Sequence, residues 1–153
     1  MLKNIDPILN ATLLYVLRSM GHGDELALVD CNFPSWSVAA STVMEEPIEL
    51  EGVDIPAAAS AILSVLPLDS FVEEPVMRME VVESPQELVE CHRDMEKVMN
   101  ADKRSWTMGH IERFEFYERA ARSYAVVTAM AERRPYGCFI LTKGVIGPDG
   151  AVV

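Results

Sequence analysis

The chain has 153 residues, of which 50% are hydrophobic, and it carries a formal net charge of −11. This length and apolar content predict a single domain over residues 1–153 with a substantial core. The acidic balance argues against nucleic acid and against an anionic membrane surface as partners, because both attract basic surfaces. A neutral or cationic small molecule fits this charge better.

The cysteine usage indicates a reducing compartment. Cys31, Cys91 and Cys138 are odd in number, and their spacing does not match a disulfide framework. The N-terminal segment lacks the layout of a signal peptide, because Asp6 and Pro7 interrupt any apolar run. No apolar run approaches the roughly 18 residues that cross a bilayer. The sequence therefore predicts a cytoplasmic protein with no membrane partner.

The first half of the chain predicts helices and a strand in alternation. Asn10 can cap a helix over residues 11–20 that Gly21 closes, and a buried strand follows over 25–30. Residues 43–50 are weakly extended. Asp54 can cap a helix over 57–65 that has Pro56 in its first turn.

The second half continues the alternation. Residues 76–82 form a strand candidate, and Ser84, Pro85 and Glu87 have the spacing of a capping box that starts a helix running to about Asn100. The remaining prediction is a polar loop over 102–110, a helix over 114–122 and strands over 124–129 and 136–142. Such alternation predicts an α/β three-layer sandwich with a mixed, mostly parallel sheet, in which the last two strands form an antiparallel pair.

Three polar residues in this frame are candidates for a site. His22 lies between two glycines, so nothing bulky blocks access to its ring, although an inconsequential loop histidine would look the same. Asp30 ends an apolar strand, at the end of a sheet strand where ligand crevices form. Asp30 and Asp69 each read either as a turn-forming cap or as a pocket group that binds a ligand or orients His22.

Four further residues form two pairs by spacing. Arg113 and Tyr117 are four apart and share one face if the helix starts early enough, although Tyr117 equally fits a core position. Tyr136 and Cys138 are two apart on the last predicted strand, so both side chains point to one face, which can be pocket or core. The sequence has neither Cys-x-x-Cys nor His-Glu-x-x-His, and no metal site is predicted.

Taken together, these motifs resemble the ribose pyranase/fucose mutarotase family, in its L-fucose mutarotase branch. The resemblance covers nearly the whole chain in the expected order. It rests on Met1-Leu2-Lys3, Ile5-Asp6-Pro7, Met20-Gly21-His22-Gly23-Asp24-Glu25, Asp30, Phe33-Pro34, Leu68-Asp69-Ser70, Arg113-Phe114, Phe116-Tyr117-Glu118-Arg119-Ala120, Tyr136-Gly137 and Lys143-Gly144-Val145.

The resemblance implies a ring-shaped homo-oligomer, typically a decamer of two stacked pentamers, with sites near subunit boundaries. It implies no metal and no organic cofactor. It implies that His22 is the proton donor and that a monosaccharide is bound by Asp30, Asp69, Arg113, Tyr117, Tyr136 and the residue at 138. This chain departs from the family at that last position, because Cys138 replaces the usual asparagine and removes an amide donor and acceptor.

The activity implied is mutarotation, the opening and reclosing of a cyclic hemiacetal to exchange its α and β anomers. One group protonates the ring oxygen and another takes the proton of the anomeric hydroxyl, and an imidazole titrating near neutral pH suits this exchange. The substrate expected is L-fucose or a related hexose, and Asp30, Tyr136 or water handles the second proton. The alternatives are pyranose–furanose interconversion of ribose and a non-catalytic monosaccharide-binding protein linked to sugar uptake.

Overall fold

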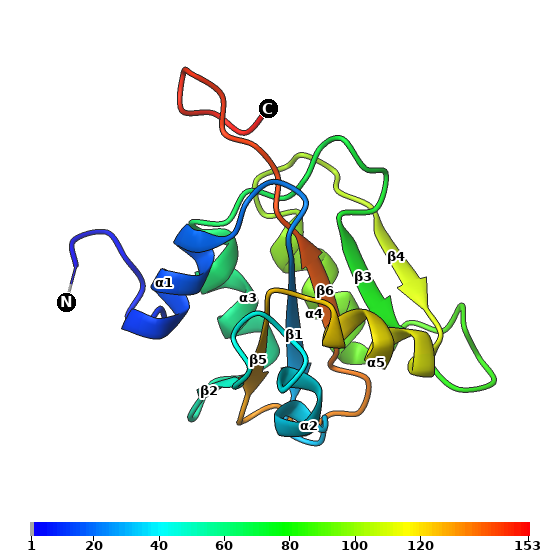
Figure 1. Ribbon diagram of the computed structural model, residues 1–153. Helices are drawn as coiled ribbons and strands as arrows, with labels where there is room; N and C mark the ends of the chain where they lie inside the picture. Colours follow the sequence, from blue (N-terminus) through cyan, green and yellow to red (C-terminus); the bar gives the residue numbers. More distant parts are fainter. Residues whose placement is uncertain (1) are drawn as a thin grey trace.

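A computed structural model describes residues 2–153, which form a six-stranded sheet between two layers of helices (Figure 1). The strand order is β2-β5-β1-β6-β3-β4. The strands are β1 (Glu25–Asp30), β2 (Ile48–Leu50), β3 (Val76–Met79), β4 (Met108–Ile111), β5 (Ala125–Ala129) and β6 (Phe139–Thr142). Among the six strands of residues 2–153, only β6 is antiparallel to its neighbours, β1 and β3, so the sheet is mixed and mostly parallel, as predicted.

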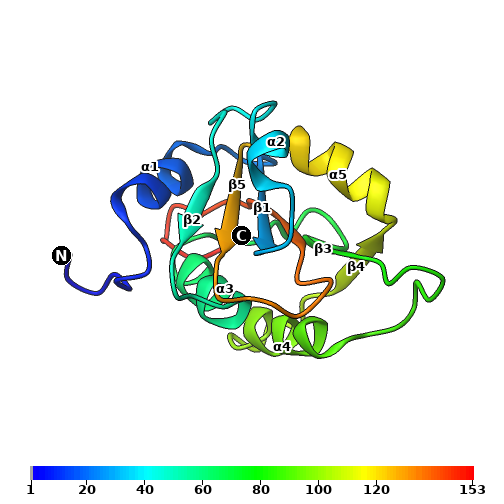
Figure 2. The ribbon, with the colours of Figure 1, turned by 90° about the horizontal axis from the view of Figure 1, so that it is seen from below.

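Five helices within residues 2–153 cover the two faces of the sheet. They are α1 (Ala11–Ser19), α2 (Ser35–Ala39), α3 (Ile55–Leu63), α4 (Glu90–Met99) and α5 (Arg113–Ala121). Helices α1, α3 and α4 pack on one face, and α2 and α5 pack on the other (Figure 2). This arrangement confirms the three-layer α/β sandwich.

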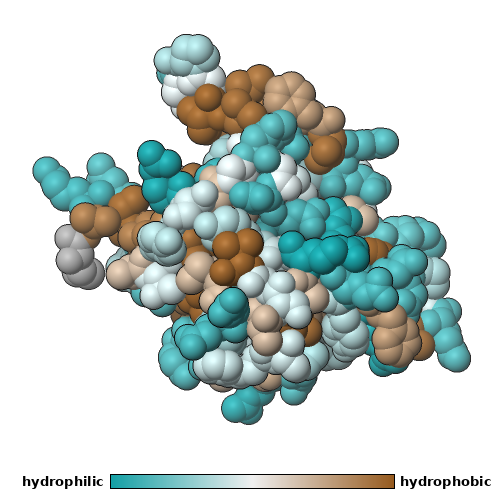
Figure 3. Space-filling view, in the orientation of Figure 1, coloured by the Kyte–Doolittle hydropathy of each residue, from teal (hydrophilic) through white to brown (hydrophobic). Residues whose placement is uncertain are grey.

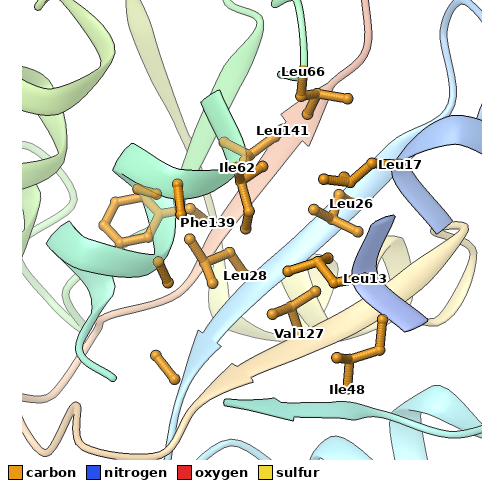
Figure 4. Close-up of a cluster of buried hydrophobic side chains, with 14 of the residues drawn as sticks. Leu13, Leu17, Leu26, Leu28, Ile48, Ile62, Leu66, Val127, Phe139 and Leu141 are labelled. Carbon is orange, nitrogen blue, oxygen red and sulfur yellow. The ribbon is translucent and has the colours of Figure 1, made fainter. Parts of the chain in front are cut away.

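The alternation of side chains along β1 divides the core in two. Leu26 and Leu28 point into the larger cluster, beneath α1 and α3, where Leu13 and Ile62 meet them (Figure 4). Ala27 and Val29 point to the opposite face. Because β1 is buried on both faces, it reads as a continuous apolar run that stops only at Asp30.

Two helix starts follow the predicted caps. The side chain of Asn10 accepts a hydrogen bond from the Leu13 amide at 2.9 Å, and that of Asp54 accepts from the Ala57 amide at 3.0 Å. Each satisfies an amide that has no partner inside the first helical turn. These local signals place α1 and α3 correctly.

The predicted capping box at Ser84 is wrong, because α4 begins only at Glu90. Instead, the chain makes a turn in which the Glu87 amide bonds to the Ser84 carbonyl. The buried guanidinium of Arg78 donates to the Pro85 carbonyl at 2.8 Å and holds this turn against β3. A tertiary contact thus overrides a favourable local pattern.

The pairing of the last two predicted strands is also wrong. β5 and β6 run in opposite directions, but β1 lies between them, so they share no hydrogen bonds. β6 begins at Phe139, and Tyr136 and Cys138 therefore lie in the loop before it. The predicted loop over 102–110 ends early as well, because residues from Met108 form β4 by pairing with the distant β3.

Candidate functional site

The sheet has two edges along which its strands end, and these edges organise the site. The "lower edge" is where β1–β5 end and β6 begins, and the "upper edge" is where β1–β5 begin and β6 ends. In Figure 1 the lower edge carries α2 and the loop leading into β6, and the upper edge carries the loop before β1.

At the upper edge, His22 meets a buried carboxylate. Its Nε2 lies 3.2 Å from Oδ2 of Asp69, and the two side chains are 50% and 4% exposed. Because an ionised carboxylate only accepts, Nε2 carries the proton and Nδ1 is left as the accepting nitrogen of the neutral ring. The arrangement is an imidazole that is oriented on one side and open to solvent on the other.

Asp69 also fixes the next part of its own loop. Its Oδ1 accepts a hydrogen bond from the Phe71 amide at 3.0 Å, which is the turn-capping role predicted for it. The Phe71 ring, 65% exposed, packs edge-to-face against His22 with 5.4 Å between ring centroids. Both roles considered for Asp69 are therefore present, and an exposed aromatic ring lies beside the imidazole.

The end of β6 holds the loop that carries His22. The Gly23 amide bonds to the Lys143 carbonyl at 2.8 Å, and the Lys143 amide bonds to the Asp24 carbonyl at 2.9 Å. The Lys143 ammonium donates to the Leu17 carbonyl at 2.8 Å and also to the Met20 carbonyl, at the C-terminus of α1. These bonds set the course of the loop from α1 into β1.

The same strand end holds the Asp69 loop from the other side. The Asp69 amide bonds to the Thr142 carbonyl at 3.1 Å, and the Gly144 amide bonds to the Pro67 carbonyl at 2.8 Å. A Cβ at Gly144 would lie only 2.3 Å from the Leu68 carbonyl oxygen. Glycine is thus required for the close approach that brings the two loops together.

At the lower edge, Asp30 is almost fully buried and is surrounded by donors. Its Oδ1 accepts from the Asn32 amide at 2.9 Å, and its Oδ2 accepts from the Gly137 amide at 3.1 Å and from Cys138 Sγ at 3.4 Å. Burial raises the pKa of this carboxyl, although the hydrogen bonds oppose the rise. Three protein donors leave a carboxylate about one free lone-pair site for a ligand. Asp30 therefore anchors the loop before β6 and does not orient His22.

Tyr136 has an unusual backbone in that loop. Its φ is +64°, the left-handed region, which costs a non-glycine residue about 1–2 kcal/mol. Its phenol oxygen accepts a hydrogen bond from the Val82 amide at 3.4 Å, so the phenol proton remains free to be donated. The predicted sharing of one strand face with Cys138 is wrong, because neither residue is in the strand and Cys138 is buried against Asp30.

Arg113 and Tyr117 complete the lower edge from α5, which starts at Arg113, one residue before the predicted helix, and so carries both side chains. Tyr117 packs on Phe33 with 5.4 Å between ring centroids, in the same apolar cluster that Tyr136 contacts. The Arg113 guanidinium lies 4.6 Å from the centre of the Phe114 ring. Its buried Nε has no hydrogen-bond partner among residues 2–153, which leaves one donor for a ligand.

The seven predicted site residues thus form two groups at opposite ends of β1. His22 and Asp69 lie before the strand, and Asp30 closes it. The five steps between the first and last of its six residues, at about 3.3 Å each, put roughly 17 Å between the two ends. The two groups of one protomer therefore cannot contact the same monosaccharide.

Sequence reasoning missed the residues that hold each group. Helix α4 lies along the loop before β6, where fully buried His92 bonds to the Tyr136 carbonyl at 3.0 Å. Phe71 and Lys143 were missed at the upper edge. None of them carries a local signal, because their partners are distant in sequence. Residues 2–153 contain no group of three or more His, Cys, Asp or Glu side chains that could hold a metal ion.

The fold and this site define a class of α/β proteins with polar groups at both edges of a mixed sheet. The chain belongs to the RbsD / FucU transport protein family, whose model matches residues 3–146.

Comparison with known proteins gives close relatives over nearly the whole chain. The chain is 42% identical over 148 residues to a fucose mutarotase of Homo sapiens, covering 95% of this chain and 94% of the relative. Its structure resembles that of Atu2016, a putative sugar binding protein, with a TM-score of 0.93, 49% identity and coverage of 96% and 97% of the two chains. It also resembles the fucose mutarotase of Streptococcus pneumoniae in complex with L-fucose, with a TM-score of 0.82, 34% identity and coverage of 95% and 100%.

Proposed function

We propose that the protein is a cofactor-independent sugar mutarotase that interconverts the α and β anomers of L-fucose or a related hexose. The observation that carries this proposal is the His22–Asp69 pair, in which a half-exposed imidazole is oriented by a buried carboxylate 3.2 Å away. The relatives named fucose mutarotase and the fold shared with an L-fucose complex support it.

In this mechanism His22 exchanges protons with the sugar. Protonation of the ring oxygen and removal of the anomeric proton open the hemiacetal, and the reverse transfers close it on the other face. Asp69 accepts the hydrogen bond of the Nε2 proton, which leaves Nδ1 of the half-exposed ring as the nitrogen that takes and returns the proton. Opening and closing need no covalent intermediate, and one histidine supplies an acid or base contribution of about 10²–10⁴-fold.

The second half of the site comes from the lower edge of a neighbouring protomer. There Arg113 and the Tyr136 hydroxyl each offer a free hydrogen-bond donor. The Asp30 carboxylate is occupied by protein donors, which favours Tyr136 or water over Asp30 as the second proton-transfer group. Tyr117 and Cys138 contribute by packing, which sets the shape of the lower edge.

Such an assembly is head-to-tail. Each protomer presents its upper edge to one neighbour and its lower edge to the other, and an interface of this kind forms a ring when its rotation closes. A decamer of two stacked pentamers meets this requirement. Exposed apolar side chains rim both edges, Phe71 and Val72 at the upper edge and Val82 and Phe114 at the lower edge. The free thiols of Cys31, Cys91 and Cys138 fit a cytoplasmic location.

The activity is tested by NMR saturation transfer between the anomer signals of L-fucose, other hexoses and D-ribose. We expect faster exchange for L-fucose or a related hexose. Acceleration limited to ribose would favour the pyranase reaction. Binding of sugar with exchange at the rate of buffer would favour a non-catalytic binding protein.

The shared site is tested by mixing two inactive proteins. His22→Ala disables the upper edge, and Arg113→Ala with Tyr136→Phe disables the lower edge. Random mixed rings join one intact upper edge to one intact lower edge in about a quarter of interfaces, and we expect that share of wild-type exchange. A mixture no faster than the mean of its two components would place the complete site within one protomer.

A further inference from the structure

The buried histidine of α4 has no part in the mechanism described above, yet it contacts the backbone of a proposed site residue. The His92 side chain is fully buried, and its ring packs edge-to-face against Phe139 with 5.8 Å between centroids. Its Nε2 lies 3.0 Å from the Tyr136 carbonyl oxygen. Its other nitrogen, Nδ1, lies 3.3 Å from the Val89 amide.

These two contacts define which ring nitrogen of His92 carries the proton. A backbone amide can only donate, so Nδ1 accepts from Val89 and carries no proton. The proton of the neutral ring is therefore on Nε2, from which it is donated to the Tyr136 carbonyl. Burial, assisted by the nearby Arg78 guanidinium, lowers the pKa of His92 to about 4, which agrees with a neutral ring.

The contact acts on the residue whose backbone is strained. Tyr136 has a φ of +64°, and strained backbone persists where surrounding contacts hold it. The neighbouring residues of α4 hold the same loop, because Cys91 Sγ donates to the Pro135 carbonyl at 3.5 Å and Arg134 donates to Asp94 at 2.8 Å. His92 is the member of this set that reaches Tyr136 itself.

We propose that His92 is a positioning residue for the sugar site: its Nε2–H fixes the Tyr136 carbonyl and so aims the Tyr136 hydroxyl at the substrate. This inference rests on the proposed function, in which that hydroxyl contacts the sugar. It assigns no proton transfer to His92, whose ring stays neutral and sealed from solvent.

A matched pair of variants separates the two ring nitrogens. Glutamine places its amide near the position of Nε2 and asparagine near that of Nδ1. We expect His92→Gln to keep most of the anomer exchange rate and His92→Asn to lose as much as Tyr136→Phe loses. The exposed neighbour supplies the control, since Arg93→Gln should exchange at the wild-type rate.

A double-mutant cycle distinguishes positioning from general destabilisation. If His92 acts through Tyr136, adding His92→Asn to Tyr136→Phe should cause no further loss of exchange. An equal additional loss in that background would overturn the proposal. Wild-type exchange by Tyr136→Phe would instead remove Tyr136 from the proposed site, and a slow Tyr136→Phe beside a fast His92→Asn would overturn this inference alone.

The wild-type protein provides a test that needs no variant. Nitrogen-15 NMR of the imidazole reports which nitrogen carries the proton. We expect the Nε2–H tautomer at neutral pH, with the Nε2 proton bonded to a carbonyl. A ring protonated on Nδ1 would contradict the hydrogen-bond pattern on which the proposal rests, whether or not the asparagine variant folds.

Discussion

The two edges of the sheet hold polar side chains in opposite ways. At the upper edge the functional imidazole is half exposed, and mainly backbone hydrogen bonds from the end of β6 hold its loop in place. At the lower edge the polar groups themselves are buried: Asp30, His92 and Glu132 are each less than 5% exposed. All three bond to the backbone of the loop before β6, Asp30 at Gly137, His92 at Tyr136, and Glu132, which belongs to that loop, at Arg134. The upper edge therefore suits proton exchange, and the lower edge suits a binding site of fixed shape.

The largest effect expected of a single substitution is at the upper edge. His22→Ala should lower the anomer exchange rate by about 10²–10⁴-fold, the usual contribution of one acid–base group, while the fold persists because the side chain is half exposed. Saturation-transfer NMR measures the rate. His110, which lies 2.6 Å from Glu80, is a second histidine–carboxylate pair, and His110→Ala should leave exchange unchanged. Equal losses of anomer exchange in His22→Ala and His110→Ala would show that the histidine of the upper edge has no special role in the reaction.

The second effect is a pH dependence of stability that a buried histidine of the lower edge causes. The folded protein keeps His92 neutral with a pKa of about 4, whereas the unfolded chain protonates it below 6.5. The unfolded state therefore binds more protons between these values, and stability should fall by roughly 3 kcal/mol as the pH drops from 6.5 to 4. Urea unfolding at several pH values measures this fall. It should shrink in His92→Gln, and an unchanged fall would show that His92 does not cause it.

A third, smaller effect tests the backbone contacts of the upper edge. In Gly144→Ala the new Cβ approaches the rigid Leu68 carbonyl to 2.3 Å, so the Asp69 loop must move. We expect about 1–3 kcal/mol of lost stability and slower anomer exchange. In Gly109→Ala the contacts at 2.3–2.6 Å are flexible ends of Glu74 and Met77, so stability and exchange should change little. Similar losses in both variants would contradict this reading.

The smallest effect is expected at Cys138. Its thiol donates to Asp30 within a fully buried setting, so it shapes the lower edge and presents no polar atom to a sugar. Cys138→Asn should change the ranking of sugars by several-fold in KM with little change in kcat, since roughly 1 kcal/mol accompanies one hydrogen bond. Exchange rates measured across a sugar panel check this, and an identical ranking would contradict it.

Local patterns predicted the frame of the fold well. The Asn10 and Asp54 caps and the apolar run of β1 are encoded by neighbouring residues, and all three are confirmed. The capping box at Ser84 was wrong because the buried Arg78 guanidinium bonds to the carbonyl of Pro85, 7 residues along the chain, and holds a turn there. The placement of β6 between β1 and β3 depends on long-range pairing, which no local pattern contains.

The site residues were predicted individually, but their grouping was not. The pairing of His22 with Asp69 spans 47 residues, and the contact of Asp30 with the loop before β6 spans 107. Sequence separation of this size carries no signal that periodicity can detect. The two groups lie at opposite edges because His22 precedes β1 and Asp30 ends it. Because β6 runs antiparallel to β1, the loop before β6 lies beside Asp30, and the residues after β6 lie beside the His22 loop.

The single reversed strand has a mechanical consequence. β6 has four residues, begins one residue after Cys138, and ends one residue before Lys143. A one-residue deletion within β6 would bring the upper-edge and lower-edge groups of site residues closer together. It would also turn side chains of the strand to the opposite face of the sheet. Length changes here should therefore be far less tolerated than in the C-terminal segment, where Figure 3 shows apolar surface and Ile146 and Val153 are about half exposed. β6 therefore fixes the distance between the two groups of site residues, and the proposed reaction depends on that distance.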